Sequence, residues 1–247
     1  MSVEKTILPM SNETRGGSQI TSVIFDYGLV LVPSPTPEDF LRMAEILGIS
    51  FEKFYPLWEN SRGAYDRGDI TPEEYWLNLA AQTNSSLNPE QIEMLRQIEV
   101  EIWARPDPEM LAWLSALQTA GFKTALLSNM PLDLIDYISE HFQWMQKFNF
   151  KTFSAAVRLI KPDPAIYEYT LRGLGVPAAE ALFIDDREPN IRAARTIGMQ
   201  AIQFRTIAEL KNDLQEMRFP IVPTISGLAA SAESSAKTPT EEIKFQL

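Results

Sequence analysis

The chain of 247 residues contains no cysteine and a single histidine, His141. Disulfide bonds, a thiolate nucleophile and zinc sites built from cysteines or several histidines are therefore excluded. A metal ion would need oxygen ligands, which suit hard cations such as Mg²⁺. Basic residues are also scarce, because 22 Lys and Arg stand against 33 Asp and Glu, giving a net charge of −11. Nucleic acids and anionic membranes both attract basic surfaces, so we expect neither as a partner.

Long hydrophobic runs are missing too, and no stretch approaches the length of a membrane span. The first twenty residues are polar and lack the apolar segment of a signal peptide. We therefore expect a cytoplasmic protein, a monomer or a homodimer, with a flexible N-terminal tail over residues 1–20. Residues 219–247 are rich in Pro, Ser, Ala, Thr and Glu without periodicity, which predicts a C-terminal tail.

Between the tails, short apolar runs bounded by turn residues predict buried strands. From residue 104 onward these runs alternate with helical patterns, which is typical of βαβ units and a parallel sheet. We therefore predict an α/β fold, a Rossmann-like parallel sheet with helices on both faces, formed by residues 21–33 and 104–218. The predicted strands cover residues 23–25, 122–127, 153–157, 181–184 and 200–204.

Residues 34–103 interrupt this alternation with four helical patterns and no strand signal. Thr71-Pro72 and Asn88-Pro89 are helix starts, each a capping side chain followed by proline. About seventy residues are far more than a loop needs. We predict a small all-helical cap domain inserted after the first strand.

Polar residues stand where the predicted strands end: Asp26, Ser128-Asn129 and Asp185-Asp186. Lys161 precedes a proline-rich helix start. Alone, each has an ordinary explanation as a helix cap, a turn residue or a solvated lysine. In a parallel sheet, however, the carboxyl ends of strands meet at one edge, where open α/β sheets bind ligands. Together these residues predict an active site.

Four segments in this order resemble the four motifs of the haloacid dehalogenase-like hydrolase superfamily. They are Phe25–Leu31, Leu126–Asn129, Lys161–Tyr167 and Phe183–Ile191. The first is similar to that of subfamily IA, variant 3, which includes bacterial sugar-phosphate phosphatases. The fourth also resembles that of the phosphatase domain of bifunctional epoxide hydrolases. The resemblance implies a phosphomonoesterase acting on a small phosphorylated metabolite such as a sugar phosphate.

The resemblance also implies a nucleophile and a metal site. Asp26 would attack phosphorus and form a phosphoaspartyl intermediate. Mg²⁺ would be held by Asp26, the carbonyl of Gly28 and Asp186, with Asp185 assisting. Because Asn190 lies one helical turn after Asp186, we expect it to orient that acid.

The remaining predicted contacts are to the phosphate group. Ser128 and Asn129 would bind its oxygens at a helix start. Lys161 would serve catalysis and substrate binding by neutralising both the phosphate and the nucleophile. Specificity should depend on the cap, and residues 61–70, with charged and aromatic side chains beside glycines, are its first candidates.

Two positions depart from the pattern. Gly28 stands where most phosphatases of the superfamily carry a second aspartate as general acid and base, and Leu29 stands where Gly or Asn is usual. We therefore expect slow turnover and a faster reaction in Gly28→Asp, since such help is worth about 10²- to 10⁴-fold. Two alternatives stay open: a 2-haloacid dehalogenase, whose aspartate attacks carbon without a metal, and a non-catalytic binder that kept the scaffold.

Overall fold

The computed structural model describes residues 19–224, and its centre is a five-stranded sheet. All neighbouring strands are parallel, in the order β3-β2-β1-β4-β5, which confirms the predicted α/β class. The register pairs Phe25 with Leu126 on one side and with Ile184 on the other. The carboxyl ends of the three central strands therefore lie at the same edge of the sheet. The strands are β1 (Ser22–Phe25), β2 (Lys123–Ser128), β3 (Phe150–Phe153), β4 (Ala181–Asp185) and β5 (Gln200–Gln203).

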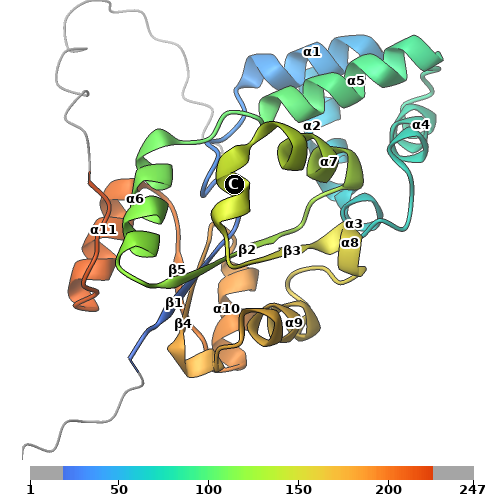
Figure 1. Ribbon diagram of the computed structural model, residues 1–247. Helices are drawn as coiled ribbons and strands as arrows, with labels where there is room; N and C mark the ends of the chain where they lie inside the picture. The colour runs from blue at the N-terminus through green and yellow to red at the C-terminus, as the bar shows by residue number, and fades with distance from the viewer. Residues whose placement is uncertain (1–18, 225–247) are drawn as a thin grey trace, which may run out of the picture.

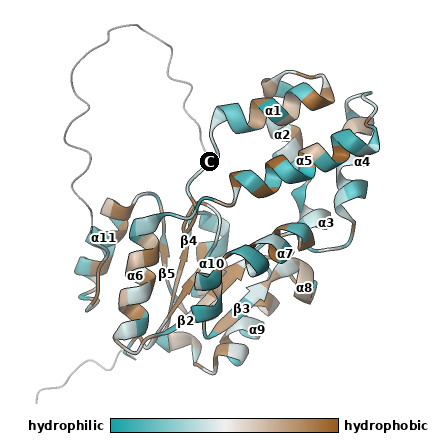
Figure 2. Cartoon of the chain, turned by 45° about the horizontal axis from the view of Figure 1, so that its top comes forward, coloured by the Kyte–Doolittle hydropathy of each residue, from teal (hydrophilic) through white to brown (hydrophobic). Residues whose placement is uncertain are grey.

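Helices cover both faces of this sheet (Figure 1). Because side chains alternate along a strand, Val23 and Phe25 face one layer while Ile24 faces the other. The first layer contains α6 (Pro108–Thr119), α7 (Leu132–His141) and α11 (Ile207–Glu216). The second contains α9 (Pro164–Leu174) and α10 (Glu188–Thr196). The strands, buried from both sides, are coloured as hydrophobic in Figure 2.

Five helices between β1 and α6 form a separate cluster with its own core, beyond the carboxyl ends of the strands (Figures 1 and 2). Capping boxes begin three of them, at Thr36, Thr71 and Asn88, each followed by a proline in the first turn. The helices are α1 (Pro37–Leu47), α2 (Phe51–Asn60), α3 (Arg62–Asp66), α4 (Pro72–Gln82) and α5 (Pro89–Ile102).

One predicted strand was wrong. The strand expected over residues 153–157 lies at Phe150–Phe153, and Ser154–Val157 form the short helix α8. A short apolar run does not by itself distinguish a strand from a helical turn. Here a tertiary contact decides: the Ser154 hydroxyl accepts a hydrogen bond from the backbone N–H of Met130, 2.8 Å away. Two 3₁₀ helices, η1 (Gln143–Lys147) and η2 (Ala178–Glu180), complete the fold.

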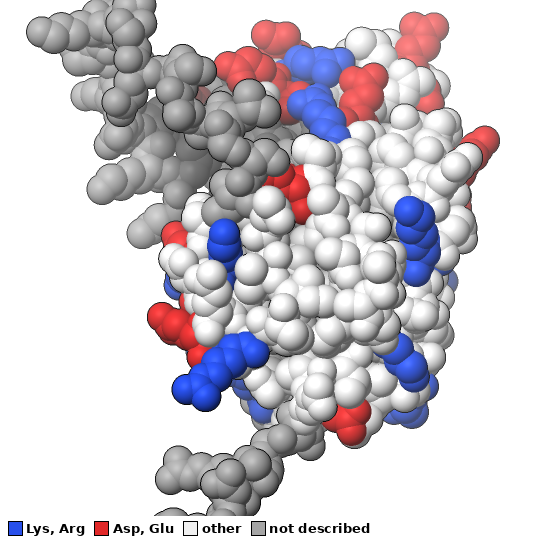
Figure 3. All heavy atoms as spheres, turned by 60° about the vertical axis from the view of Figure 1, so that its left-hand side comes forward, with Lys and Arg blue, Asp and Glu red and all other residues white. Residues whose placement is uncertain are grey.

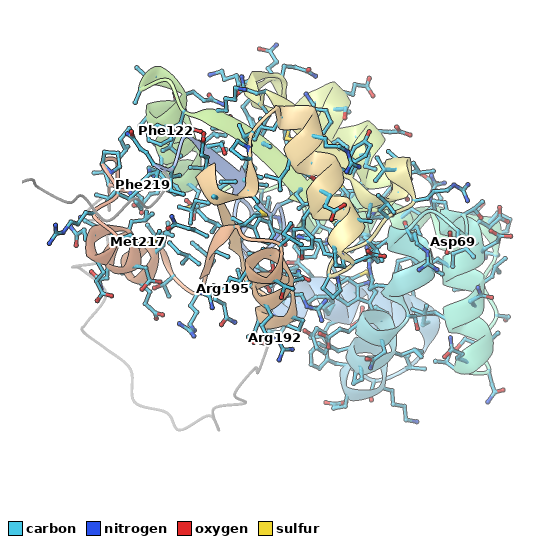
Figure 4. The ribbon with its side chains drawn as sticks, turned by 90° about the horizontal axis from the view of Figure 1, so that it is seen from below. Asp69, Phe122, Arg192, Arg195, Met217 and Phe219 are labelled. Carbon is cyan, nitrogen blue, oxygen red and sulfur yellow. The ribbon has the colours of Figure 1, made fainter. Side chains whose placement is uncertain are left out.

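The chain continues to pack on the core after α11. Phe219 is buried, and its ring centroid lies 5.2 Å from that of Phe122 (Figure 4). Trp113 Nε1 donates a hydrogen bond to the carbonyl of Ile221 at 2.9 Å. The packed chain thus extends beyond residue 218, where the expected tail begins. The rest of that tail from residue 225, and residues 1–18, lie outside the described residues.

Within residues 19–224, no helix combines the length and the apolar character needed to cross a bilayer. On the face that Figure 3 presents, Lys and Arg side chains are scattered, and at its top they lie beside Asp and Glu side chains.

We predict that Phe219→Ala lowers the free energy of unfolding by about 3 kcal/mol, because it removes a buried aromatic ring. Urea unfolding monitored by circular dichroism measures this. Met217→Ala is the matched control, since Met217 lies two residues away, is 37% exposed, and should change stability by less than about 1 kcal/mol. Equal effects of the two substitutions would show that the segment after α11 does not support the core.

Candidate active site

Three carboxylates meet at the carboxyl edge of the sheet. Asp26 follows β1, Asp185 ends the neighbouring strand β4, and Asp186 comes next. Oxygen atoms of the three side chains lie within 4.8 Å of one another. Asp26 lies next to Asp185 and Asp186 because β1 and β4 are parallel neighbours, although the residues are far apart in the sequence.

A buried lysine joins two of these acids. Lys161 lies in the loop between α8 and α9, and its Nζ is 2.8 Å from Asp26 Oδ1 and 2.7 Å from Asp185 Oδ2. Burial acts to lower the pKa of Lys161, but Asp185 and Asp26 outweigh it and hold that pKa above its ordinary value. The lysine is therefore an ammonium ion fixed beside Asp26.

Asp185 is a support for this lysine. Its two oxygens accept hydrogen bonds from Asn190 Nδ2 at 2.9 and 3.0 Å, and Oδ1 also accepts one from the N–H of Arg187 at 2.8 Å. The expectation that Asn190 orients Asp186 was therefore wrong. Alternation along β4 turns Asp185 toward the layer of α10, where Asn190 lies, whereas Asp186 lines the cavity described below. Asp185 itself is fully buried and does not line that cavity.

The surroundings of Asp26 and Asp186 resist the ionisation of both acids. Burial, together with the neighbouring Asp185 and Asp186, raises the pKa of Asp26 to about 8 against the attraction of Lys161. Burial, with Asp185 beside it, raises the pKa of Asp186 to about 6. Three carboxylates thus share one ammonium group, and all the candidate ligands are oxygens. This donor set fits a hard divalent cation such as Mg²⁺.

The predicted phosphate-binding residues lie on the same cavity wall. Ser128 ends β2 and is 3% exposed. Asn129 has a different use for its side chain: its Oδ1 accepts from the N–H of Lys161 at 2.8 Å, and its Nδ2 donates to the Lys161 carbonyl at 3.1 Å. The side-chain amide of Asn129 therefore fixes the lysine loop.

Gly28 also lines the cavity, and an aromatic ring covers it. A Cβ atom added at Gly28 would lie 3.2 Å from Trp103, the first residue after α5. The hydroxyl of Tyr27 donates a hydrogen bond to the Trp103 carbonyl at 2.8 Å, which keeps this residue in place. The next residue, Leu29, adopts a left-handed conformation with φ of 60°, where Gly or Asn is more usual. Nothing in the sequence indicated that Trp103 returns to Gly28 from the far end of the cap.

The cavity has a volume of about 360 Å³ and lies between the sheet edge and the cap. Of the segment 61–70, Arg62 and Asp66 line it. Tyr65 is instead buried, with its hydroxyl donating to Asp133 Oδ1 at 2.9 Å. Asp69 is exposed at the outer side of the cap (Figure 4). The cap thus contributes part of the predicted segment to the site.

Comparisons with known proteins agree with this geometry. The model of the haloacid dehalogenase-like hydrolase family matches residues 63–198, more than half of the chain. A sesquiterpene phosphatase of Aspergillus oryzae is 30% identical over 179 residues, covering 72% of this chain and 86% of that protein. Bifunctional epoxide hydrolase 2 of Rattus norvegicus is 35% identical over 121 residues, which are 46% of this chain but 22% of the rat protein.

Among solved structures, a HAD-family enzyme of Bacteroides thetaiotaomicron superposes with a TM-score of 0.62, covering 76% of this chain and 94% of that chain. Its sequence identity is 19%, so this likeness concerns the fold alone. Two of the other matches identify the family. The family model covers more than half of the chain, and the fungal relative covers 72% of it. Relatives of the chain, the fungal protein among them, are named as phosphatases. The chain itself belongs to the haloacid dehalogenase-like hydrolase family.

Proposed function

We propose that the protein is a Mg²⁺-dependent phosphomonoesterase that acts on a small phosphorylated metabolite through Asp26. One observation carries this proposal. The Asp26 carboxylate lies on the cavity wall, bound to buried Lys161 and within 4.8 Å of Asp186. A nucleophile, a fixed positive charge and a cation-binding acid are thus in one place, which is what transfer of a phosphoryl group to a carboxylate requires.

In the first step a carboxylate oxygen of Asp26 forms a bond to phosphorus while the ester P–O bond breaks. The leaving alkoxide takes a proton from water. Oδ1 of Asp26 accepts from the Tyr27 N–H at 2.7 Å and contacts Lys161, so the other oxygen, Oδ2, is the one proposed to attack. In the second step water attacks the phosphoaspartate, and inorganic phosphate leaves as Asp26 is restored.

The chain's own groups organise these steps. Lys161 reduces the repulsion between the anionic nucleophile and the phosphate, and Asp185 and Asn129 hold it in position. Ser128 is proposed to donate a hydrogen bond to a phosphate oxygen. Asp26, Asp186 and the Gly28 carbonyl would hold Mg²⁺, which when bound supplies charge neutralisation for the transferring group.

The dehalogenase alternative is a weaker match to this site. A reaction at carbon without a metal would leave Asp26, Asp185 and Asp186 with Lys161 as their shared counter-charge. A cluster of acids that excludes a cation is costly in a buried site. The phosphatase names among the relatives support the same choice.

A first prediction concerns the metal. Chelation of divalent ions should abolish phosphate release from small monoesters, and added Mg²⁺ should restore it. Asp186→Asn should need at least about tenfold more Mg²⁺ for half-maximal activity, because it removes one anionic ligand. Glu188→Gln, an exposed acid two residues away, is the control. Full activity in excess chelator would contradict the proposal.

A second prediction concerns charge repulsion in the metal-free protein. Asp26→Asn should abolish turnover but raise the melting temperature in chelator, since it removes one of three clustered acids. The pKa values of Asp26 and Asp186 lie above the ordinary value in the folded protein. Ionisation of these acids as the pH rises therefore lowers the free energy of unfolding. The difference in melting temperature should therefore be larger near pH 8 than near pH 6. A wild type that is more stable than Asp26→Asn at both pH values would overturn this account.

A third prediction concerns the missing general acid. Gly28→Asp alone should bring little gain, because its Cβ would meet the Trp103 ring at 3.2 Å. The combination with Trp103→Ala should hydrolyse alkyl phosphates about tenfold faster than Trp103→Ala alone, as the carboxylate gains room to protonate the leaving group. Nitrophenyl phosphate, whose leaving group needs no proton, serves as the control ester. A single Gly28→Asp that matched the double variant would show that Trp103 is no obstacle.

A further inference from the structure

Much of the lining of the cavity is apolar. Six large apolar side chains line it, supplied by the cap, by the segment that follows α5, and by the start of α7 and the loop before it. The volume of about 360 Å³ is that of a site for a small organic molecule. These side chains are Phe40, Tyr55, Trp58, Trp103, Met130 and Leu134.

The positive charge that the cap brings to this cavity is already neutralised. Among the described residues that line the cavity, Arg62 is the basic side chain contributed by the cap. Its Nη2 lies 2.8 Å from Asp66 Oδ1, and its Nη1 is paired with the buried carboxylate of Glu99. The guanidinium carbon also lies 5.0 Å from the centroid of Trp58. The guanidinium group of Arg62 is therefore paired with two acids and lies over an aromatic ring. We do not expect it to bind a second phosphate or carboxylate group of a substrate.

The polar groups of the cavity are concentrated at the phosphate end. Elsewhere, the charged lining residues are the paired Arg62 and Asp66 of the cap, and Glu59 and Arg187, which are both exposed. Next to the nucleophile, at Gly28, the ring of Trp103 takes the place of a polar side chain. A sugar would bring several hydroxyl groups against these apolar surfaces, and each would lose hydrogen bonds to water without replacement.

We infer, resting on the proposed function, that the substrate is the phosphate monoester of a bulky apolar alcohol. One phosphate group lies at Asp26 and Lys161, and a hydrocarbon or aromatic body lies against the cap. Burial of that body supplies affinity through the hydrophobic effect, which needs surface area and no directed contacts. The same apolar surfaces discriminate against sugar phosphates.

Octyl phosphate and glucose 6-phosphate test this inference, because both release a primary alcohol and differ in the polarity of the rest of the molecule. With Mg²⁺, we expect kcat/KM to be at least about tenfold higher for octyl phosphate, mainly through KM. Binding is measured separately by calorimetry, with octylphosphonate and glucose 6-phosphate added to Asp26→Asn. Equal or better use of the sugar phosphate would overturn the inference.

The two measurements separate this inference from the proposed function. If no ester is hydrolysed but octylphosphonate binds at least about tenfold more tightly, the apolar specificity stands while the phosphatase proposal fails. If esters are hydrolysed without preference for octyl phosphate, the phosphatase proposal stands and the inference fails.

Tyr55 supplies the matching variants, since it lines the cavity from α2 and is half-buried. Tyr55→Ala should lower kcat/KM for octyl phosphate about tenfold and leave glucose 6-phosphate nearly unchanged, whereas Tyr55→Phe should retain activity on both. Phe51→Ala is the control: its ring centroid lies 5.7 Å from that of Tyr55, but it does not line the cavity. Melting temperatures verify folding. Equal losses on both esters, or a loss in Tyr55→Phe as large as in Tyr55→Ala, would contradict the inference.

Discussion

One buried ammonium group orders the carboxyl edge of the sheet. Lys161 bridges Asp26 and Asp185 at 2.8 and 2.7 Å. Removing the ammonium group would leave two carboxylates without their counter-charge, which typically costs about 3–5 kcal/mol. Asn129 fixes its backbone, and Asn190 holds the far carboxylate. The segments that supply these residues are far apart in the sequence. The bridge therefore makes the geometry of the nucleophile depend on how the strands and loops of the core pack together.

The cap contains a second paired cation with a different consequence. Arg62 is paired with Asp66 and Glu99 and lies over aromatic rings, so its charge is used within the protein. Lys161, in contrast, contacts Asp26, the proposed nucleophile. The two clusters divide the cavity into a charged end, where the phosphate can be stabilised, and an apolar end, where size and shape decide what fits.

The order of strands and helices could be predicted from apolar runs and capping residues, because those signals are local. Asp26 and Asp185 could be placed at one edge because parallel strands end together. The partner of Asn190 could not be predicted: helical spacing pointed to Asp186, but strand alternation turns Asp185 toward α10. The position of Trp103 could not be predicted either. Its contact with Gly28 joins residues on either side of the cap in the sequence and depends on the tertiary structure of the whole cap.

The contacts between the cap and the core hold the two ends of the cavity in position relative to each other. Each part has its own apolar core, but several of the contacts between them are polar: the Tyr65 hydroxyl with Asp133, Arg96 Nε 3.4 Å from the same carboxylate, and the Tyr27 hydroxyl with the Trp103 carbonyl. Polar contacts at a joint exchange with water at little cost, unlike the separation of apolar surfaces. A cavity bounded by such polar contacts can admit an apolar substrate while Asp26 keeps its position. The groups that contact Asp26, Lys161 and the Tyr27 N–H, belong to the core.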